Sequence, residues 1–558
     1  MNKDRVILSE SNKRIILGFV LFLMTIAVSL PSIFVKYPSV SPDIHFHLNR
    51  IIGIAEELSH GHFPVRMSSY WLNGYGYPAS VYYGDILLYF PAVLYMLGIN
   101  IINCYRIYIL FINVITIVLA YICFSKIFDG RRISLILTMI YCTSNYRLSD
   151  IYYRGAIGEA TAIAFLPLIL YALYRIYSFN ENRLSTYIIF AFGMTGVLVS
   201  HIITFVLVII GILFICIFFY KSTFKWVTIK TYIISAVLTI GLSAYFLIPF
   251  LDYYISENTA ISNTVKSGNS ELYYNSAVLI ELFNFFGESD KISYTPGMFL
   301  IIPFLICIPL IIQKKIGKSE IKVFFISAMI LIISSNIFPW DMLIKYSKIF
   351  TFISAIQFPF RFITIAVVFM AYLAGRMFII LRKNDPVLFK KLIILVICLN
   401  AFVFGKYVID YYLKNHLNTE LCANTYDIGA GGEYLLSGAE KNDFSKTDIL
   451  CDGDIILKKQ DGTDREYYVN DYHSGTMVSL PILNYKYYNV YDKNGNLINI
   501  VDSDNKRISF MLDDGYIGDI KLIYEEPMIW RLSEWISVIS LICIFLCMII
   551  SFVRRRKV

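Results

Sequence analysis

The sequence predicts a mainly α-helical, polytopic membrane protein with a small β-rich domain just before its last helix. Three observations predict this fold class. Hydrophobic residues make up 57% of the 558 residues and charged residues only 16%, and the mean hydropathy is +0.61, which excludes an ordinary soluble enzyme. Long apolar runs recur along most of the chain, and one polar stretch near the C-terminus changes to alternating, strand-like patterning.

The apolar runs indicate how many helices cross the membrane. A helix needs about 20 apolar residues to cross roughly 30 Å of hydrocarbon. About twelve segments approach that length, so we assign residues 1–409 to a transmembrane domain and residues 530–558 to a final helix with a basic tail. The expected spans are 14–36, 104–126, 132–147, 157–178, 184–200, 202–220, 229–251, 297–313, 321–336, 360–381, 389–409 and 530–552.

The basic residues predict the orientation of these spans, because short cytoplasmic loops collect Lys and Arg. Both termini and alternate loops are basic, so both termini are expected in the cytoplasm of a multi-pass cell-membrane protein. The pattern requires that Ile86–Ile99, which is short and contains Pro91, be an interfacial or re-entrant helix. The net charge of +8 then follows from topology and needs no nucleic acid partner. The expected outer loops are 37–103, 147–158, 252–296 and 337–359.

Residues 410–529 are expected to form the extracytoplasmic β-rich domain. Alternating runs such as Asp454–Lys459, Glu466–Val469 and Met477–Leu480 are separated by turn sequences such as Asp461-Gly462, a pattern typical of hairpins. Cys422 and Cys451 are the two cysteines of this domain. An oxidising exterior makes them the candidate pair for a disulfide, although sequence alone does not give their geometry.

The first outer loop carries the densest group of candidate site residues. Carboxylates next to Tyr and Trp rings suit a carbohydrate site, because the rings stack on sugars and the polar groups bind hydroxyls. For any single Tyr, an interfacial aromatic belt explains the residue equally well. The candidates are Asp43, His45, His47, Arg50, Arg66, Tyr75 and Tyr77.

The second outer turn adds two acids and a cation. Asp150 and Arg154 lie between two expected spans and Glu159 lies in the first turn of the second, on the membrane face that also holds Asp43. A simpler interpretation is also open. Glu159 would be stabilised in the first turn of a helix without any function, and Asp150 and Arg154 would be solvated loop charges.

A third element, Gln357-Phe-Pro-Phe-Arg361-Phe, places a guanidinium where a span begins at the outer surface. Arg forms paired hydrogen bonds with phosphate oxygens, and a lipid phosphate lies at that depth. Snorkelling to ordinary headgroups is the alternative for Arg361. His201, between two spans, is a further candidate, for which a structural histidine is the simpler interpretation.

Two kinds of metal site are considered. The pairs His45-x-His47 and His60-x-His62 would supply zinc ligands, but residues i and i+2 of a helix point apart. A divalent cation such as Mg²⁺ or Mn²⁺ on Asp43 and Asp150 fits better, because hard cations take oxygen ligands and neutralise phosphate. The chain has no P-loop, so ATP-driven transport has no support.

The order of these motifs resembles the membrane glycosyltransferases of the GT-C superfamily. More closely, it resembles the bacterial YfhO-like membrane proteins and the group named for a 6-pyruvoyl-tetrahydropterin-synthase-related membrane domain. The matching motifs run in order through nearly the whole chain, and each motif is short. They are Asp43-Ile-His-Phe-His47-Leu-Asn-Arg50, Gly61-His-Phe-Pro64-Val-Arg66, Gly74-Tyr-Gly-Tyr-Pro78, Arg154-Gly-Ala-Ile-Gly-Glu159-Ala, Ser200-His201, Gln357-Phe-Pro-Phe-Arg361-Phe and Gly431-Gly-Glu433-Tyr-Leu.

The resemblance implies transfer of a sugar from a polyprenyl-phosphate carrier to an extracytoplasmic acceptor, usually with inversion. It assigns the role of base to Asp43 by position, and it extends a catalytic role to Asp150 or Glu159. The chemistry agrees with this assignment. Polyprenyl phosphate leaves without a general acid, so one carboxylate is enough to activate the acceptor hydroxyl, and Arg154 and Arg361 would stabilise the departing phosphate.

Two other functions stay open at this point. Many helices without an ATP site would also suffice for a flippase or exporter of lipid-linked sugars. Transport should need polar residues deep within the spans, however, and the charged residues here lie at helix ends. A non-catalytic cell-envelope assembly protein would use the β-rich domain to bind wall polymer. The sequence does not indicate which sugar is transferred. It also does not indicate whether the acceptor is a teichoic acid, another glycan, a lipid or a protein.

Overall fold

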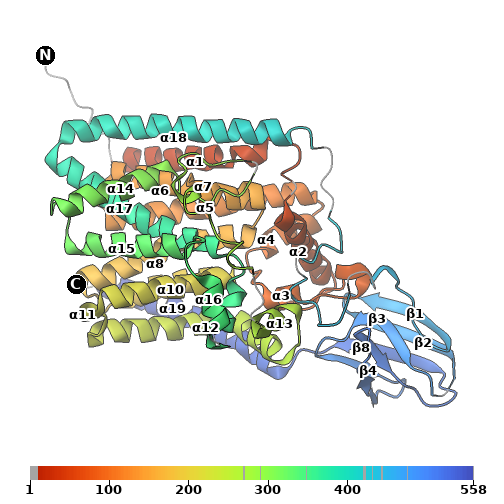
Figure 1. Cartoon of the computed structure of the whole chain (residues 1–558). Coiled ribbons are helices and arrows are strands. Elements are labelled where there is room, and N and C mark those ends of the chain that lie inside the picture. The colour runs from red at the N-terminus through yellow and green to blue at the C-terminus, as the bar shows by residue number, and fades with distance from the viewer. Residues whose placement is uncertain are drawn as a thin grey trace.

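The computed structural model describes residues 10–39, 41–267, 271–289, 291–346, 348–418, 423–429, 432–440, 444–473 and 475–556. Within these ranges the chain forms a bundle of helices and, at one end of it, a small β domain (Figure 1). The candidate disulfide lies outside the described residues, because Cys422 does.

Each of the twelve expected spans coincides with a helix. Seven of these helices are long and apolar enough to cross a membrane on their own, namely α1, α5, α8, α12, α17, α18 and α19. The structure therefore supports a mainly helical membrane protein and does not fix the number of crossings at twelve. The bundle helices are α1 (Glu10–Phe34), α5 (Ile101–Ile127), α6 (Arg131–Cys142), α8 (Ile157–Phe179), α9 (Leu184–Leu198), α10 (Ile202–Phe218), α12 (Trp226–Ser256), α14 (Met298–Ile312), α15 (Lys318–Ile333), α17 (Ile363–Asn384), α18 (Pro386–Asn415) and α19 (Met528–Arg556).

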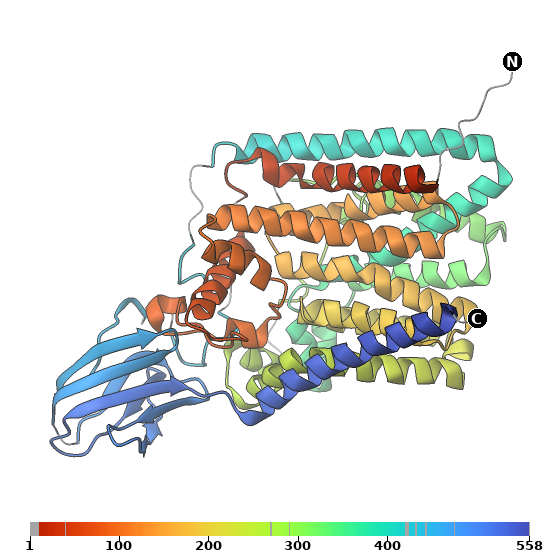
Figure 2. The same cartoon turned by 180° about the vertical axis from the view of Figure 1, so that it is seen from behind.

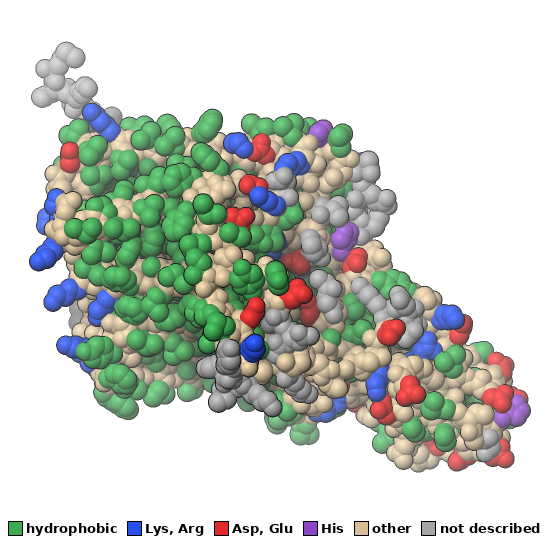
Figure 3. All heavy atoms as spheres, viewed as in Figure 1, with side chains coloured by type: hydrophobic (Ala, Val, Ile, Leu, Met, Phe, Trp, Pro, Cys, Tyr) green, Lys and Arg blue, Asp and Glu red, His purple; other side chains and the backbone are tan. Residues whose placement is uncertain are grey.

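The basic turns gather at one end of the bundle. Arg131 donates to the Lys13 carbonyl (2.6 Å), and Arg382 donates to the Asp129 carbonyl (2.6 Å). The start of α1 and the end of α19 both lie at this end, opposite the β domain (Figures 1 and 2). On the face drawn in Figure 3, hydrophobic side chains cover the bundle and Lys and Arg cluster along its basic edge. The bundle thus has a basic end and a β-domain end.

The remaining helical segments are short, apart from α2. The segment Ile86–Ile99 contains only the eight-residue α4, in agreement with the prediction that it is no full crossing. These segments are α2 (Pro42–Ser59), η1 (Trp71–Gly74), α3 (Ala79–Tyr82), α4 (Tyr89–Met96), α7 (Asn145–Leu148), η2 (Ser149–Arg154), α11 (Tyr220–Thr223), α13 (Ala260–Ser267), η3 (Glu281–Phe283), α16 (Trp340–Tyr346), η4 (Lys348–Ile356) and η5 (Pro359–Phe362).

The β domain consists of two antiparallel sheets, with strand orders β1-β2-β8-β4-β5 and β3-β7-β6. The expected hairpin is present, because β1 and β2 pair around a turn in which Gly462 has a positive φ of 59°. The expected domain limits shift slightly, since α18 continues to Asn415 and α19 begins at Met528. The strands are β1 (Gly453–Asp461), β2 (Asp464–Tyr472), β3 (Val478–Leu483), β4 (Tyr488–Tyr491), β5 (Leu497–Ile498), β6 (Ile500–Val501), β7 (Arg507–Phe510) and β8 (Gly518–Tyr524).

The first long loop packs into the β domain. Trp71, Tyr75 and Tyr77 are buried in the same hydrophobic core as strand residues such as Val469 and Val490. The Leu483 amide also donates to the Tyr75 carbonyl (2.9 Å). The loop and the β domain therefore share one core, which fixes the domain against the end of the bundle.

Candidate functional site

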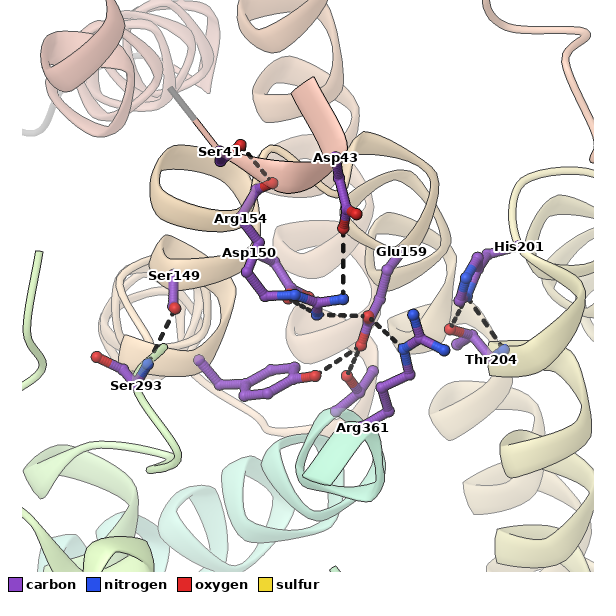
Figure 4. A network of polar contacts seen from close by, with 12 residues as sticks. Ser41, Asp43, Ser149, Asp150, Arg154, Glu159, His201, Thr204, Ser293 and Arg361 are labelled. Atoms are coloured by element: carbon purple, nitrogen blue, oxygen red, sulfur yellow. Dashed lines mark hydrogen bonds and ion pairs between the residues drawn. The ribbon is translucent and has the colours of Figure 1, made fainter. Parts of the chain in front are cut away.

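Five of the predicted site residues meet in one network of polar contacts (Figure 4). Arg154, at the end of η2, lies at their centre. It contacts Asp150 Oδ1 at 2.6 Å, Glu159 Oε2 at 2.9 Å and Asp43 Oδ2 at 3.7 Å. Arg361, from η5, approaches Glu159 Oε2 through its Nε at 3.4 Å. Segments more than 300 residues apart in the sequence (Asp43 and Arg361) thus form one cluster of charges.

Glu159 is the buried anchor of this cluster. Besides both arginines, Tyr146 OH (2.8 Å) and Thr364 Oγ1 (3.0 Å) donate to its Oε1. Its side chain is only 1% exposed. A buried carboxylate with four partners is stabilised as an anion, and its oxygens are occupied. Glu159 therefore holds the two guanidinium groups in place and is not available as a base.

Asp150 differs from Glu159 in its surroundings. It is fully buried, and among the residues that the structure describes its Oδ2 has no hydrogen-bond partner, while Oδ1 accepts from Arg154. Burial, followed by the charge of Glu159, raises the pKa of Asp150 well above its usual range. Asp150 is thus the carboxyl group of the cluster that most readily carries a proton.

Asp43 lies at the open edge of the cluster. Its side chain is 35% exposed, and it sits in the first turn of α2, after Pro42 at the helix start. Ser41 Oγ donates to the Arg154 carbonyl (2.6 Å), which fixes this end of α2 against η2. Gly155 makes the close approach feasible, because it has a φ of +66° and a Cβ there would lie 2.8 Å from Ser41 Oγ. Asp43 is therefore the carboxylate of the cluster that an external molecule can reach.

Arg361 keeps unused hydrogen-bonding capacity although its side chain is only 9% exposed. Its Nε makes no hydrogen bond among the described residues, and its Nη1 donates only a long bond, 3.5 Å, to the Ile356 carbonyl. The guanidinium also stacks on Phe358, 4.7 Å from the ring centre. A buried guanidinium with spare donors is suited to binding an anion such as a phosphate.

His47 and His201 flank the cluster and are both buried. Burial and the nearby Arg361 lower the pKa of His201 to about 3, and burial with Arg50 lowers the pKa of His47 well below its usual range. Both rings are therefore neutral at pH 7. His201 Nδ1 accepts from the Thr204 amide (3.2 Å), which is a helix-cap role.

Tyr83 connects the two histidines and was missed as a site residue. Its ring centre lies 5.7 Å from that of His47 and 5.6 Å from that of His201, and the Arg50 guanidinium stacks on it at 4.0 Å. Arg50 also donates to the Gly84 carbonyl (2.7 Å). The ring fits beside α8 because Gly158 has no side chain, since a Cβ there would lie 2.1 Å from Tyr83 OH.

The aromatic residues predicted to contact a sugar lie elsewhere. Tyr75 and Tyr77 have no exposed surface. Tyr75 OH donates to the Lys446 carbonyl (2.5 Å), and Tyr77 OH donates to the Ile428 carbonyl (3.2 Å). The prediction that these two rings are open to a carbohydrate is wrong for this structure, because both fill the core shared with the β domain.

The other predicted binding residues lie at or beyond the margin of the cluster. Arg66 pairs with Glu534 at the start of α19 (2.9 Å) and is not part of the cluster. His45 Nδ1 lies 3.9 Å from Asp427 Oδ2. Gln357 has a φ of +58° just before η5, so it shapes the turn that presents Arg361.

The described residues do not form a metal centre of the predicted kinds. They contain no group of three or more His, Cys, Asp or Glu side chains suited to a metal ion. Arg154 binds both Asp43 and Asp150, so a cation on these two carboxylates would have to replace a guanidinium. His60 instead pairs with Asp461 (2.8 Å) and His62 with Glu57 (2.7 Å). The residues present therefore fit neither the zinc nor the Mg²⁺ or Mn²⁺ site.

No protein-family model matches the chain. A protein of Lactococcus lactis subsp. cremoris described as an uncharacterized protein is 23% identical over 312 residues, which cover 53% of this chain and 50% of that protein. The chain thus spans about half the length of this relative.

Proposed function

We propose that the protein is an integral membrane glycosyltransferase that moves a sugar from a polyprenyl-phosphate carrier to an acceptor outside the cytoplasm. The observation that carries this proposal is the pairing of an accessible carboxylate with preorganised cations. Asp43 is partly exposed and contacts Arg154, and Glu159 holds Arg154 next to a second buried arginine, Arg361. Sugar transfer from a phosphate carrier needs one base and a cationic site for the leaving group.

In the proposed reaction, Asp43 accepts the proton of an acceptor hydroxyl group. The hydroxyl oxygen attacks the anomeric carbon, and the bond from that carbon to the phosphate oxygen breaks with its electron pair on the phosphate. Attack opposite the leaving oxygen inverts the anomeric centre. Arg361, with its spare donors, and Arg154 stabilise the negative charge on the departing phosphate.

The proposed partners are a polyprenyl-phosphate sugar and a cell-envelope acceptor, which is a teichoic acid, another glycan, a lipid or a protein. The protein would lie in the cell membrane, with both termini in the cytoplasm and the β domain outside. Protease added to intact cells should then cut the exposed β4–β5 turn and leave a C-terminal tag intact. Loss of the tag with an intact β domain would contradict this orientation.

The proposal is tested with purified protein in liposomes that contain a radiolabelled polyprenyl-phosphate sugar and a cell-envelope acceptor extract. A transferase releases free polyprenyl phosphate and moves the label to the acceptor. A flippase moves the intact lipid-linked sugar between leaflets, and an assembly protein leaves it unchanged. Translocation without release, or no change with any donor tested, would refute the transferase.

A further inference from the structure

The segment 274–286 displays an unusual number of apolar side chains outside the long helices. It connects α13 to α14 and has only one short helical turn, η3. Six large apolar residues in it are between 37% and 79% exposed. These residues are Tyr274, Val278, Ile280, Phe283, Phe285 and Phe286. Soluble surfaces rarely expose a contiguous apolar group of this kind unless it contacts a partner or a membrane.

The segment is held firmly at the ends of two bundle helices. Ala277 exchanges hydrogen bonds with the end of α15, donating to the Ser334 carbonyl (3.0 Å) and accepting from the Asn336 amide (2.9 Å). The Phe285 carbonyl accepts from the Met298 amide (3.3 Å), the first residue of α14. Its apolar side chains therefore continue the surface of α14 and α15 toward the β-domain end.

The lengths of these two helices leave part of a membrane uncovered. α14 has 15 residues and α15 has 16, so they are about 22 and 24 Å long at about 1.5 Å per residue. The hydrocarbon core is roughly 30 Å thick. The turn between α14 and α15 carries three exposed lysines, Lys314, Lys315 and Lys318, which mark the boundary with water. The missing apolar length therefore falls at the β-domain end, where the segment 274–286 lies.

We infer that the segment 274–286 is a membrane-inserted loop that contacts the acyl chains and headgroups of the leaflet on the β-domain side. Its continuity with the apolar surface of α14 favours lipid over a second copy of the chain. The loop also carries Glu281 and Asn284, which suit the headgroup region better than the hydrocarbon centre.

This placement sets the depth of the candidate site. The Ser293 amide, after the loop, donates to Ser149 Oγ (3.0 Å) in η2, next to Asp150. The charge cluster would then lie at headgroup depth, where the phosphate of a membrane lipid reaches it laterally.

The inference is tested by photo-crosslinking to lipid. The full-length protein is prepared in liposomes of radiolabelled phosphatidylglycerol and phosphatidylcholine, with p-benzoylphenylalanine replacing Ile280 or, in a second variant, Tyr274. Ile306 of α14 serves as the lipid-facing control and Leu497 of β5 as the water-facing control, and both are exposed apolar residues. Each variant is first checked for a monodisperse profile in gel filtration.

We expect labelled lipid adducts at Ile280 and Tyr274 at a yield within about threefold of Ile306, and at least tenfold above Leu497. Yields at both loop positions equal to that of Leu497 would overturn the inference. Protein dimers at these positions in place of lipid adducts would also overturn it and identify the surface as an interface between copies. The experiment requires no catalysis, so its failure would leave the proposed sugar transfer untouched.

Discussion

The geometry of the candidate site depends on the different environments of its three carboxylates. Glu159 accepts hydrogen bonds at both oxygens, Asp150 is buried with one oxygen that has no partner in the described part of the chain, and Asp43 is partly exposed. Two arginines cannot balance three negative carboxylates, two of which are buried. The cluster is therefore best balanced when Asp150 is protonated and Asp43 keeps its access to water.

Replacing Glu159 with Gln should destabilise the protein by about 3–5 kcal/mol, because two buried guanidinium groups lose their shared counter-ion. Replacing Asp150 with Asn should cost less than about 1 kcal/mol at pH 7, since the amide resembles the protonated carboxyl. Denaturant titration in detergent measures both changes. Equal losses for the two variants would contradict the different roles assigned to these residues.

The pH dependence of stability gives an independent check on Asp150. A carboxyl group whose pKa is raised by folding stabilises the protein below its ordinary pKa, and this contribution is lost as the pH rises through the raised value. Wild-type stability should therefore fall toward alkaline pH more steeply than that of Asp150→Asn. Parallel pH profiles would show that Asp150 is ionised in the folded protein.

At the scale of elements, Arg66 fastens the first long loop to two helices. Its Nη2 donates to the Tyr245 carbonyl in α12 (2.9 Å) and to Glu534 in α19 (2.9 Å). The side chain is 2% exposed and its guanidinium lies 5.7 Å from the Trp530 ring centre. Arg66 thus acts as a clamp that holds the first long loop against the last helix.

Arg66→Ala should cost about 2–3 kcal/mol, because a buried carbonyl and a carboxylate lose charged donors. Arg531→Ala is the matched control, since Arg531 contacts the same Glu534 at 3.3 Å but is 51% exposed. We expect this exposed pair to contribute less than about 1 kcal/mol. Denaturant titration compares the two variants, and a larger effect for Arg531→Ala would refute the clamp.

The pair His62 and Glu57 fastens the same loop to the β1–β2 turn. His62 Nδ1 lies 2.7 Å from Glu57, and a Cβ on Gly462 of the turn would lie 2.5 Å from Glu57 Oε2, which shows how tightly the turn is seated. The hydrogen bond to Glu57 raises the pKa of His62. The stabilisation is therefore complete below the ordinary pKa of histidine and is lost as the pH rises through the raised value.

His62→Gln should lower the thermal unfolding midpoint at pH 5.5 more than at pH 8.5. The reason is that only the protonated ring forms the ion pair with Glu57. His416→Gln, at the end of α18, controls for loss of an imidazole near the surface. An equal drop at both pH values would mean that the His62 contact does not depend on its charge.

At the scale of the whole molecule, hydropathy and charge predicted the architecture well. Every expected span is a helix because the hydrophobic pattern is local, and the hairpin turn at Gly462 is likewise a local signal. Hydropathy did not determine the number of full membrane crossings, since five of these helices fall short of the length or composition of an independent span. The expected orientation, with both termini in the cytoplasm, stays a prediction.

The site was predicted in part, for a physical reason. Charged residues at helix ends such as Asp43, Arg154 and Arg361 stand out in an apolar sequence. Tyr83 and Thr364 do not, because a tyrosine or threonine in a membrane protein has many ordinary explanations. Tyr75 and Tyr77 looked like sugar contacts because the sequence does not show that the β domain covers them.

The role of Asp43 as the base is tested by comparing wild-type protein with Asp43→Asn in the release of polyprenyl phosphate from its sugar-carrying form. Asp410→Asn is the control, because Asp410 has the same 35% exposure, pairs with Lys406 and lies outside the cluster. We predict that Asp43→Asn loses at least about 100-fold in rate with an unchanged unfolding midpoint, while Asp410→Asn stays active. Release by Asp43→Asn at the wild-type rate would show that Asp43 is not the base.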